Sequence, residues 1–298
     1  MISKYIFPIS VLLFLISLTS CEDFFETTLE LDPPPFETTL VIDCVAHTGQ
    51  DSIEMRISRN AGILENIDVN ELGLNDADVV LTINGVSSKA EYFFDEFSFH
   101  NRNNYRAVLS SPLKTNDEVL LEVTHKEFGK ASASVRILPN IEIMSAVFTE
   151  DGGLDREGDE RSKVTVTFKD PQDKNFYALQ ILAPDWDDML SPMYISSLDP
   201  SVFESYEGTT LILTDDGYNG KEKSIDFQIY RLPKEWAKGK IKLIWYSISE
   251  DYYKYSRSLQ AHKNTADNPF GTPVPVYSNI IGGAGIFALH NFQMIDVD

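Results

Sequence analysis

Short runs of β-branched and aromatic residues, each bounded by turn residues, recur along most of the chain and constrain its fold more than any other feature. The clearest run is Val79–Ile83, which leads directly into Asn84 and Gly85. An Asn-Gly pair favours the positive backbone angles of a two-residue hairpin turn, so a second strand is expected to return beside the first. Residues 119–124 alternate between apolar and polar side chains, which is typical of a strand with one buried face. The pattern therefore predicts a mainly β fold.

The strand signals fall into two groups on either side of Pro139, and a chain of 298 residues is long enough for two modest cores. Seven runs precede this proline and indicate an immunoglobulin-like β-sandwich over residues 39–139. Residues 140–298 are expected to form a second β-rich domain with one helix near residues 250–265, which Ser249 can cap. The expected strands are Leu40–Ala46, Ile53–Ser58, Ala77–Ile83, Tyr92–Phe94, Tyr105–Leu109, Val119–His125, Ala131–Ile137, Ile143–Phe148, Val164–Phe168, Phe176–Leu182, Thr209–Leu213, Ile225–Tyr230, Ile241–Ile248 and Ile286–Leu289.

Residues 1–20 have the pattern of a signal peptide. An apolar stretch over residues 6–18 follows Lys4 and is too short to span a bilayer comfortably. It ends in Leu18-Thr19-Ser20-Cys21, and a Cys at this place is typical of a bacterial lipoprotein signal, in which Cys21 becomes the acylated first residue. The alternative is an ordinary signal peptide with an incidental cysteine. The lipoprotein interpretation predicts a membrane contact made by acyl chains.

Residues 21–38 are expected to form an extended, acidic tether. Glu22, Asp23 and Glu26 follow Cys21, and the triplet Pro33–Pro35 favours polyproline geometry. Acidic residues at this place resemble the signal that sends Bacteroidota lipoproteins to the outer face of the outer membrane. The alternative is a solvated linker without an address. The expected location is therefore the outer membrane, with the protein lipid-anchored and exposed on the cell surface.

The charge of the chain limits its partners. It carries 46 Asp and Glu against 25 Lys and Arg, a formal net charge of −21 at pH 7. Such a surface repels nucleic acid and anionic lipid headgroups, so neither is expected to bind through protein charge. Contact with the membrane must then come from the lipid anchor.

Cys44 is the second of two cysteines in the chain. Acylation of Cys21 would leave Cys44 without a disulfide partner, and its strand-like surroundings favour a buried, inert thiol. A catalytic thiol needs a nearby His or cation to lower its pKa. His47 lies three residues further along the strand and therefore on the opposite face.

No local motif for a metal, a cofactor or a catalytic nucleophile is found, so the sequence predicts no catalytic residue, no metal and no cofactor. Asp155, Glu157 and Asp159 have the spacing that begins a calcium loop, but the required Gly and the bidentate Glu are missing further on. Residues 215–226 fit such a loop better, with Gly220 sixth and Asp226 twelfth. Their third residue is a Gly without a side-chain oxygen, and a tight hairpin turn explains the same segment.

Trp186 is a weak candidate for ligand binding. It lies in an acidic segment, Asp185–Asp188, where its ring could stack on a sugar or meet a cationic group. The alternative is a loop tryptophan that folds back onto the core.

The C-terminal half contains one specific pattern, made of Ser247–Tyr255, Asn268–Ile280 and Gly282–Phe287, with Asp216–Lys221 as a supporting piece. This pattern resembles the Bacteroidota surface lipoproteins grouped as domain of unknown function 4249. The resemblance spans the mature chain and is strongest in the C-terminal block. The usual first strand of the family contains a Gly that is absent from Leu40–Cys44, which weakens the N-terminal match.

The resemblance implies a companion of a TonB-dependent outer-membrane transporter, analogous to surface lipoproteins that capture nutrients and cap the transporter. No catalytic or ligand residues are established for the family, so none are carried over. The expected function is a non-enzymatic accessory or ligand-capture subunit. Two alternatives are a structural or adhesive β-sandwich protein and a surface hydrolase with a non-local site. The hydrolase would need a deep pocket that contains several carboxylates with raised pKa values, drawn from Asp185, Asp187, Asp188, Asp215 and Asp216.

Overall fold

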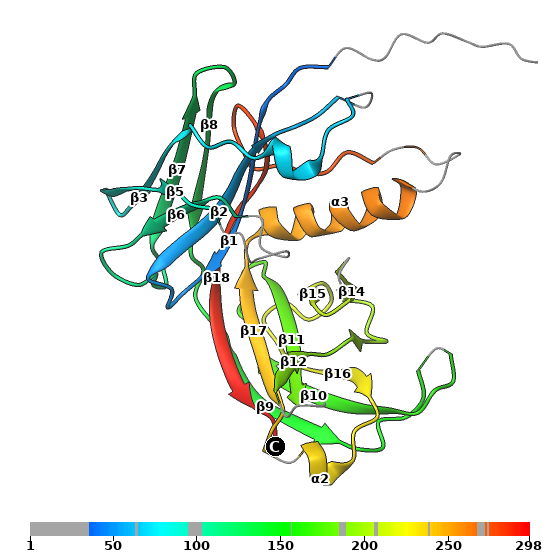
Figure 1. Cartoon of the computed structure of the whole chain (residues 1–298). Helices are drawn as coiled ribbons and strands as arrows, with labels where there is room; N and C mark the ends of the chain where they lie inside the picture. The colour runs from blue at the N-terminus through cyan, green and yellow to red at the C-terminus, as the bar shows by residue number, and fades with distance from the viewer. Residues whose placement is uncertain are drawn as a thin grey trace, which may run out of the picture. The chain divides into compact units, whose positions relative to one another are not determined.

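The structure is a computed structural model that describes residues 36–62, 65–94, 103–155, 157–184, 189–205, 208–237, 239–266, 272 and 274–298. By their contacts, residues Thr38–Asp298 form one compact unit. The described strands make one ten-stranded sheet and two four-stranded sheets (Figure 1), which confirms the predicted mainly β fold class. Within these ranges, none of the helices has the length and apolar character that a membrane crossing requires.

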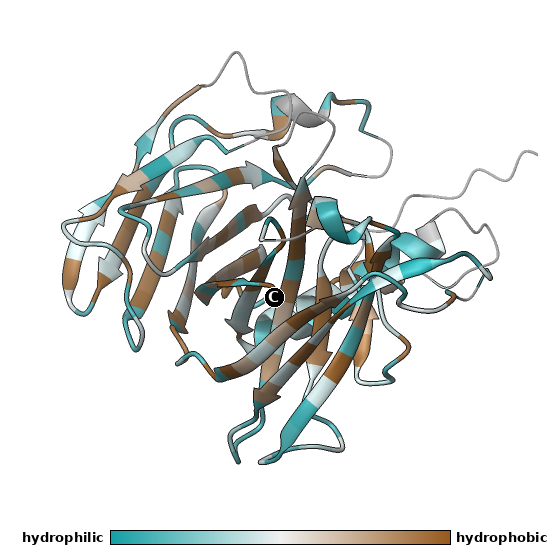
Figure 2. Cartoon of the chain, turned by 90° about the horizontal axis from the view of Figure 1, so that it is seen from below, coloured by the Kyte–Doolittle hydropathy of each residue, from teal (hydrophilic) through white to brown (hydrophobic). Residues whose placement is uncertain are grey.

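The first hydrophobic core lies between one part of the ten-stranded sheet and a four-stranded sheet. Apolar and hydrophilic residues alternate along many strands (Figure 2), and in β1 the alternate residues Leu40, Ile42 and Cys44 face this core. The predicted Asn84-Gly85 turn joins β3 to β4 with a positive φ at both residues. The large sheet contributes β1 (Leu40–His47), β2 (Ser52–Arg59), β5 (Glu91–Tyr92) and β6 (Tyr105–Val108), and the small sheet consists of β3 (Asp78–Ile83), β4 (Val86–Lys89), β7 (Glu118–His125) and β8 (Gly129–Arg136), with the 3-10 helix η2 (Val69–Leu72) ahead of β3.

The second core repeats this arrangement with other strands of the ten-stranded sheet. Its large aromatic side chains pack on one another, and the ring centroid of Phe168 lies 4.9 Å from that of Trp245 and 5.8 Å from that of Tyr177. The large sheet contributes β11 (Phe176–Pro184), β12 (Leu190–Pro192), β14 (Val202–Glu204), β15 (Leu211–Thr214) and β17 (Lys242–Ile248), and the second small sheet consists of β9 (Glu142–Thr149), β10 (Arg161–Lys169), β13 (Ile195–Ser196) and β16 (Glu222–Tyr230), with the short helix α2 (Lys234–Ala237) ahead of β17.

β18 (Ala284–Asp296) belongs to both halves of the unit. Residues 284–290 pair in parallel with β1, and residues 291–296 pair antiparallel with β17. Phe287 and Leu289 of this strand therefore lie in the first core, although they come from the end of the chain. The two cores share this one strand. Whether residues 39–139 fold independently of residues 140–298 stays a prediction.

α3 (Glu250–Ala266) is the helix expected near residues 250–265. Its cap is the predicted one, because the Oγ of Ser249 accepts a hydrogen bond from the backbone N–H of Tyr252 at 3.2 Å. Tyr252 and Tyr253 pack on a small apolar cluster on the outer face of the ten-stranded sheet. The segment after the helix is tied back to it, since the hydroxyl of Tyr277 donates a hydrogen bond to Asp251 at 2.5 Å. The helix is therefore fixed at both its sheet side and its N-terminal turn.

The glycine-rich segment ahead of β18 packs closely against neighbouring strands. Gly285 has a φ of +110°, and a Cβ added there would overlap the carbonyl oxygen of Ile42. Asn279 holds both backbone groups of Phe287, donating to its carbonyl at 2.8 Å and accepting from its N–H at 3.0 Å. These contacts show that Asn279 and Gly285, both in the C-terminal sequence pattern, hold β18 close to β1.

Candidate functional site

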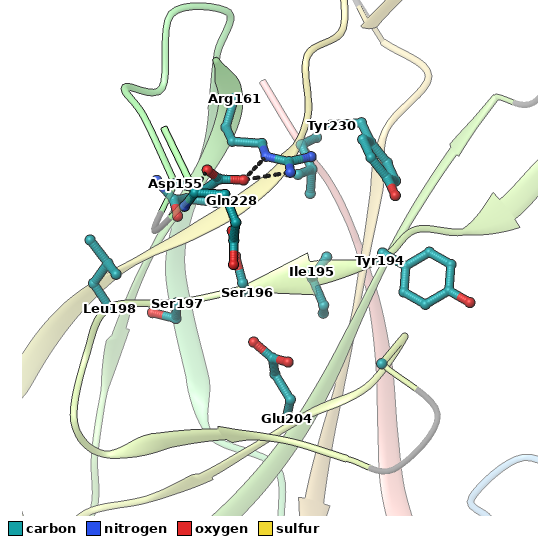
Figure 3. Close-up of a pocket in the computed structure, with 13 residues that line it drawn as sticks. Asp155, Arg161, Tyr194, Ile195, Ser196, Ser197, Leu198, Glu204, Gln228 and Tyr230 are labelled. Atoms are coloured by element: carbon teal, nitrogen blue, oxygen red, sulfur yellow. Dashed lines mark hydrogen bonds and ion pairs between the residues drawn. The ribbon is translucent and has the colours of Figure 1, made fainter. Parts of the chain in front are cut away.

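A cavity of about 340 Å³ opens beside the edge strand β13 and its neighbour β16. The loop ahead of β10 and the segment after β14 complete its walls (Figure 3). We call this cavity the cleft. The side chains that define its character are Asp155, Arg161, Tyr194, Glu204, Gln228 and Tyr230.

Asp155 and Arg161 form a largely buried ion pair on one side of the cleft. The Nε of Arg161 donates to Asp155 at 2.7 Å, and the backbone N–H groups of Glu157 and Asp159 donate to the other carboxylate oxygen at 3.0 and 2.9 Å. These bonds, led by the one from the Asp159 backbone, hold the pKa of Asp155 below its usual value. Asp155 therefore shapes its own loop, and the pair adds no net charge to the cleft.

Aromatic side chains and a second carboxylate form the rest of the wall. The guanidinium carbon of Arg161 lies 5.0 Å from the ring centroid of Tyr230. Tyr194 is 61% exposed, and its ring lies against Gly208, where a Cβ would approach it to 3.0 Å. Figure 3 shows the carboxylate of Glu204 pointing into the open space opposite the Asp155–Arg161 pair.

The cleft continues into a second cavity of about 500 Å³, and the two share Ser197, Leu198 and Gln228 in their walls. Leu198 is 63% exposed and Leu154, which lines the second cavity, is 59% exposed. The walls of the two connected cavities therefore combine exposed leucines with hydroxyl and carboxylate groups.

Several predicted site residues lie outside the described residues. These are Cys21 with the tether up to residue 35, and Trp186 with its acidic neighbours Asp185, Asp187 and Asp188. The rejected calcium loop does supply Asp155 and Glu157 to the cleft. In the part of the chain that the structure describes, no three His, Cys, Asp or Glu side chains are placed to hold a metal ion.

The three carboxylates of the other calcium-like segment do not share one site, because two of them meet at Lys174 and the third lies elsewhere. Lys174 lies between Asp215, at 2.7 Å, and Asp216. The hydrogen bond from Lys174 is the main cause of a lowered pKa at Asp216. Asp226 belongs to a different surface, where its carboxylate accepts a hydrogen bond from Lys163 at 2.8 Å. The segment is a tight turn, as the simpler interpretation of its sequence predicts.

A buried network fixes that turn to the second core. Asp170 is 2% exposed, accepts a hydrogen bond from the hydroxyl of Tyr177 at 2.5 Å and accepts another from the backbone N–H of Gly220 at 2.9 Å. Burial raises the pKa of Asp170 in spite of these bonds. Asp170 lines neither part of the cleft, so its role is to hold the turn in place.

Cys44 is buried in the first core, as its strand-like surroundings predict. Burial raises the pKa of its thiol, and the Sγ lies 3.8 Å from the carbonyl oxygen of Glu54. His47 lies on the opposite face of β1, so it does not activate the thiol.

The described residues define a mainly β protein with two cores, one shared strand and an open cleft. The chain belongs to the family described as Domain of unknown function (DUF4249), whose model matches residues 26–295. No curated protein matches the sequence. A solved structure of a biofilm-associated protein, its BSP domain, is 8% identical with a TM-score of 0.22 over 87% of this chain and 59% of that chain. The chain thus spans less than two thirds of that structure, and a likeness this low implies nothing about function.

Proposed function

We propose that the protein is a Bacteroidota lipoprotein, anchored by acyl chains at Cys21 to the outer membrane and exposed at the cell surface. There it acts as an accessory or ligand-capture partner of a TonB-dependent transporter. Its role is binding and not catalysis. Residues 21–38 serve as the tether that carries the folded unit away from the membrane.

The observation that carries this proposal is the sequence Leu18-Thr19-Ser20-Cys21 at the end of a short apolar segment. A thiol at this place is the acceptor for acylation, and more than one acyl chain is needed for a durable anchor. Glu22 and Asp23, directly after it, support export to the cell surface. The family pattern in the C-terminal half supports the transporter as partner.

The cleft supports a capture role. It is open, it combines aromatic rings with hydroxyl and carboxylate groups, and the exposed side chains of Leu154 and Leu198 lie in its walls. Glu204 supplies the carboxylate that faces the open space (Figure 3), so the cleft suits a polar ligand or one that carries a positive charge.

Affinity capture from outer membranes solubilised in mild detergent tests the proposed partnership. The tag follows Asp298, so that the N-terminal segment is processed normally. We expect a TonB-dependent barrel, identified by mass spectrometry, to be recovered in an amount comparable to that of the tagged protein.

The matched control is Cys21→Ser, which keeps the folded unit but removes the acceptor for acylation. This variant should be lost from the outer-membrane fraction and should recover no barrel from it. Capture of the wild-type protein without any TonB-dependent barrel, repeated after cross-linking in intact cells, contradicts the proposed partnership.

A further inference from the structure

The cleft carries more negative charge than its own ion pair neutralises. One guanidinium and three carboxylates line it among the described residues. Arg161 and Asp155 neutralise each other as an ion pair. The two remaining carboxylates, those of Glu157 and Glu204, have no ion-pair partner among the residues that the structure describes. The cleft therefore offers two acceptors that a cationic ligand can use.

Both glutamates are carried by segments that the fold holds in place. The loop that contains Glu157 is closed by backbone hydrogen bonds, including one from the N–H of Asp155 to the carbonyl of Asp159 at 3.0 Å. Glu204 is the last residue of β14, which pairs with β15. Figure 3 shows the carboxylate of Glu204 turned towards the open space of the cleft. Because the backbone at both positions is already ordered, a ligand loses little affinity to ordering them.

Gln228 adds a further acceptor where the two cavities meet. Its side chain lines both cavities, and the residue is 8% exposed. The Nε2 of Gln228 donates to the carbonyl of Leu154 at 3.0 Å, and no described residue donates to its Oε1. This oxygen is not sealed inside the protein, so a donor in the cavities can reach it. Amide oxygens in such positions normally accept a hydrogen bond, so the position favours a ligand that donates.

The tyrosine rings of the cleft favour a planar cation. A guanidinium presents five N–H donors in one plane and stacks on aromatic rings, whereas an ammonium has no such plane. Arg161 shows this arrangement within the protein, because its guanidinium lies 5.0 Å from the ring centroid of Tyr230 and donates to Asp155. Tyr194 and Glu204 offer a second ring and a second carboxylate in the same cleft, without a cation among the described residues.

The second cavity has a different character. Its two carboxylates, those of Asp199 and Asp226, are each paired with a lysine. Its exposed apolar groups are Leu154 and Leu198, and Leu198 also lines the cleft. A ligand that fills both cavities therefore needs a cation beside an apolar group. A peptide carries both on neighbouring residues, and volumes of about 340 and 500 Å³ leave room for more than one side chain.

We propose that the cleft and the second cavity together bind an extended peptide, with an arginine side chain in the cleft and an apolar side chain against Leu154 and Leu198. Glu204 neutralises the guanidinium, Tyr194 stacks on it, and Gln228 accepts a hydrogen bond from the peptide. The formal net charge of −21 attracts such a basic peptide from a distance. The inference rests on the proposed capture role and names the class of molecule that is captured.

Calorimetric titration of the purified full-length protein with the peptide acetyl-Ala-Arg-Leu-Ala-amide tests the proposal. We expect saturable binding that added salt weakens. The same peptide with citrulline in place of arginine keeps the shape without the charge, and it should bind about tenfold more weakly or less. A lysine peptide should bind with an affinity between these two, because an ammonium cannot stack as a plane. Free arginine amide should bind more weakly than the arginine peptide, because it does not fill the second cavity.

Two matched variants separate the cleft from the rest of the acidic surface. Glu204→Gln removes one charge from the cleft with little change of shape, so it should weaken binding of the arginine peptide about tenfold and leave that of the citrulline peptide unchanged. Glu122, an exposed residue of β7 that lines none of the described cavities, is the control, and Glu122→Gln should bind as the wild type does.

The proposal is overturned if the arginine peptide does not bind saturably, if the citrulline peptide, the lysine peptide or free arginine amide binds as tightly, or if Glu204→Gln binds as well as Glu122→Gln. The titration contains neither a transporter nor a membrane. Recovery of a barrel without peptide binding therefore rejects this inference alone, whereas peptide binding without a barrel rejects the proposed partnership alone.

Discussion

His47 of β1 and His290 of β18 are direct partners in a parallel strand pair, so histidines from opposite ends of the chain lie side by side on one face of the large sheet. His290 is buried there, whereas His47 is partly exposed. The same strand pair places residues from the end of the chain in the first core. The first core therefore depends on β18.

The free energy of unfolding should fall as the pH is lowered from about 6.5 towards 3. His290, with a pKa lowered to about 3, stays neutral in the folded protein, while the unfolded chain takes up a proton below about 6.5. Because only the unfolded state takes up this proton, the free energy of unfolding falls by up to about 1.4 kcal/mol for each pH unit below about 6.5. Above a pH of about 6.5 the neutral His290 makes its full contribution to stability. Urea unfolding at several pH values between 5 and 7 measures this slope.

His290→Gln should remove that part of the slope, since the variant has no proton to take up. The groups that face His290 are His47, Tyr246 and Tyr252, so His47→Gln separates the contribution of the neighbouring imidazole. An equal slope in wild type and His290→Gln would show that His290 is not a buried neutral base.

Gly285→Ala should destabilise the protein by about 3 kcal/mol or more, because the added Cβ would overlap the carbonyl of Ile42 in a backbone conformation with a φ of +110°. Gly49 has a φ of +89° and nothing within 4 Å of an added Cβ, so Gly49→Ala costs only the backbone strain, about 1 kcal/mol. Thermal and urea unfolding of both variants measure the difference. Equal losses would mean that the close approach of β18 to β1 is not required.

Lys174→Met should lower the free energy of unfolding by about 3 kcal/mol, because it leaves the carboxylate of Asp215, 1% exposed, without its cation. Lys89 pairs with Asp78 on an open surface, so Lys89→Met should cost at most about 0.5 kcal/mol. Calcium should not restore the stability of Lys174→Met, since only the carboxylates of Asp215 and Asp216 meet at the position of the ammonium, and Asp226 lies on a different surface. A large rescue by calcium would support the calcium interpretation of residues 215–226.

A fragment of residues 39–139 should not fold alone. It lacks Ile280, Phe287 and Leu289, which are at most 7% exposed in the first core, and it exposes the edge of β1 that normally pairs with β18. Residues 38–298 should show one cooperative unfolding transition. Circular dichroism and thermal unfolding of both chains give the test, and a cooperative transition in the fragment would support two independent domains.

Local patterns in the sequence predict the positions of the elements well. The Asn84-Gly85 turn, the Ser249 cap and the buried face of β1 all follow from neighbouring residues, so their physical causes are visible in a short window. Short edge segments such as β13 have too few residues for a pattern, and they were not predicted.

Long-range pairing is what the sequence does not reveal. The closing strand was predicted over residues 286–289, whereas β18 extends to Asp296 and joins both cores, because its partners are distant strands and not a hairpin neighbour. The walls of the cleft also come from segments that are distant in the sequence, so short sequence patterns do not reveal the cleft. The spacing of Asp155, Glu157 and Asp159 indicates only the beginning of a calcium-loop pattern, whereas the role of Asp155 depends on its pairing with Arg161.

The proposed role depends most directly on where the protein resides. Labelling of growing cells with an alkyne analogue of palmitate, followed by proteinase K treatment of intact cells, measures the anchor and the exposure together. We expect label on the wild-type protein and none on Cys21→Ser, and we expect protease to digest the labelled protein while the outer membrane is intact. A wild-type protein that carries no label, or that is protected until the outer membrane is broken, would contradict the surface lipoprotein.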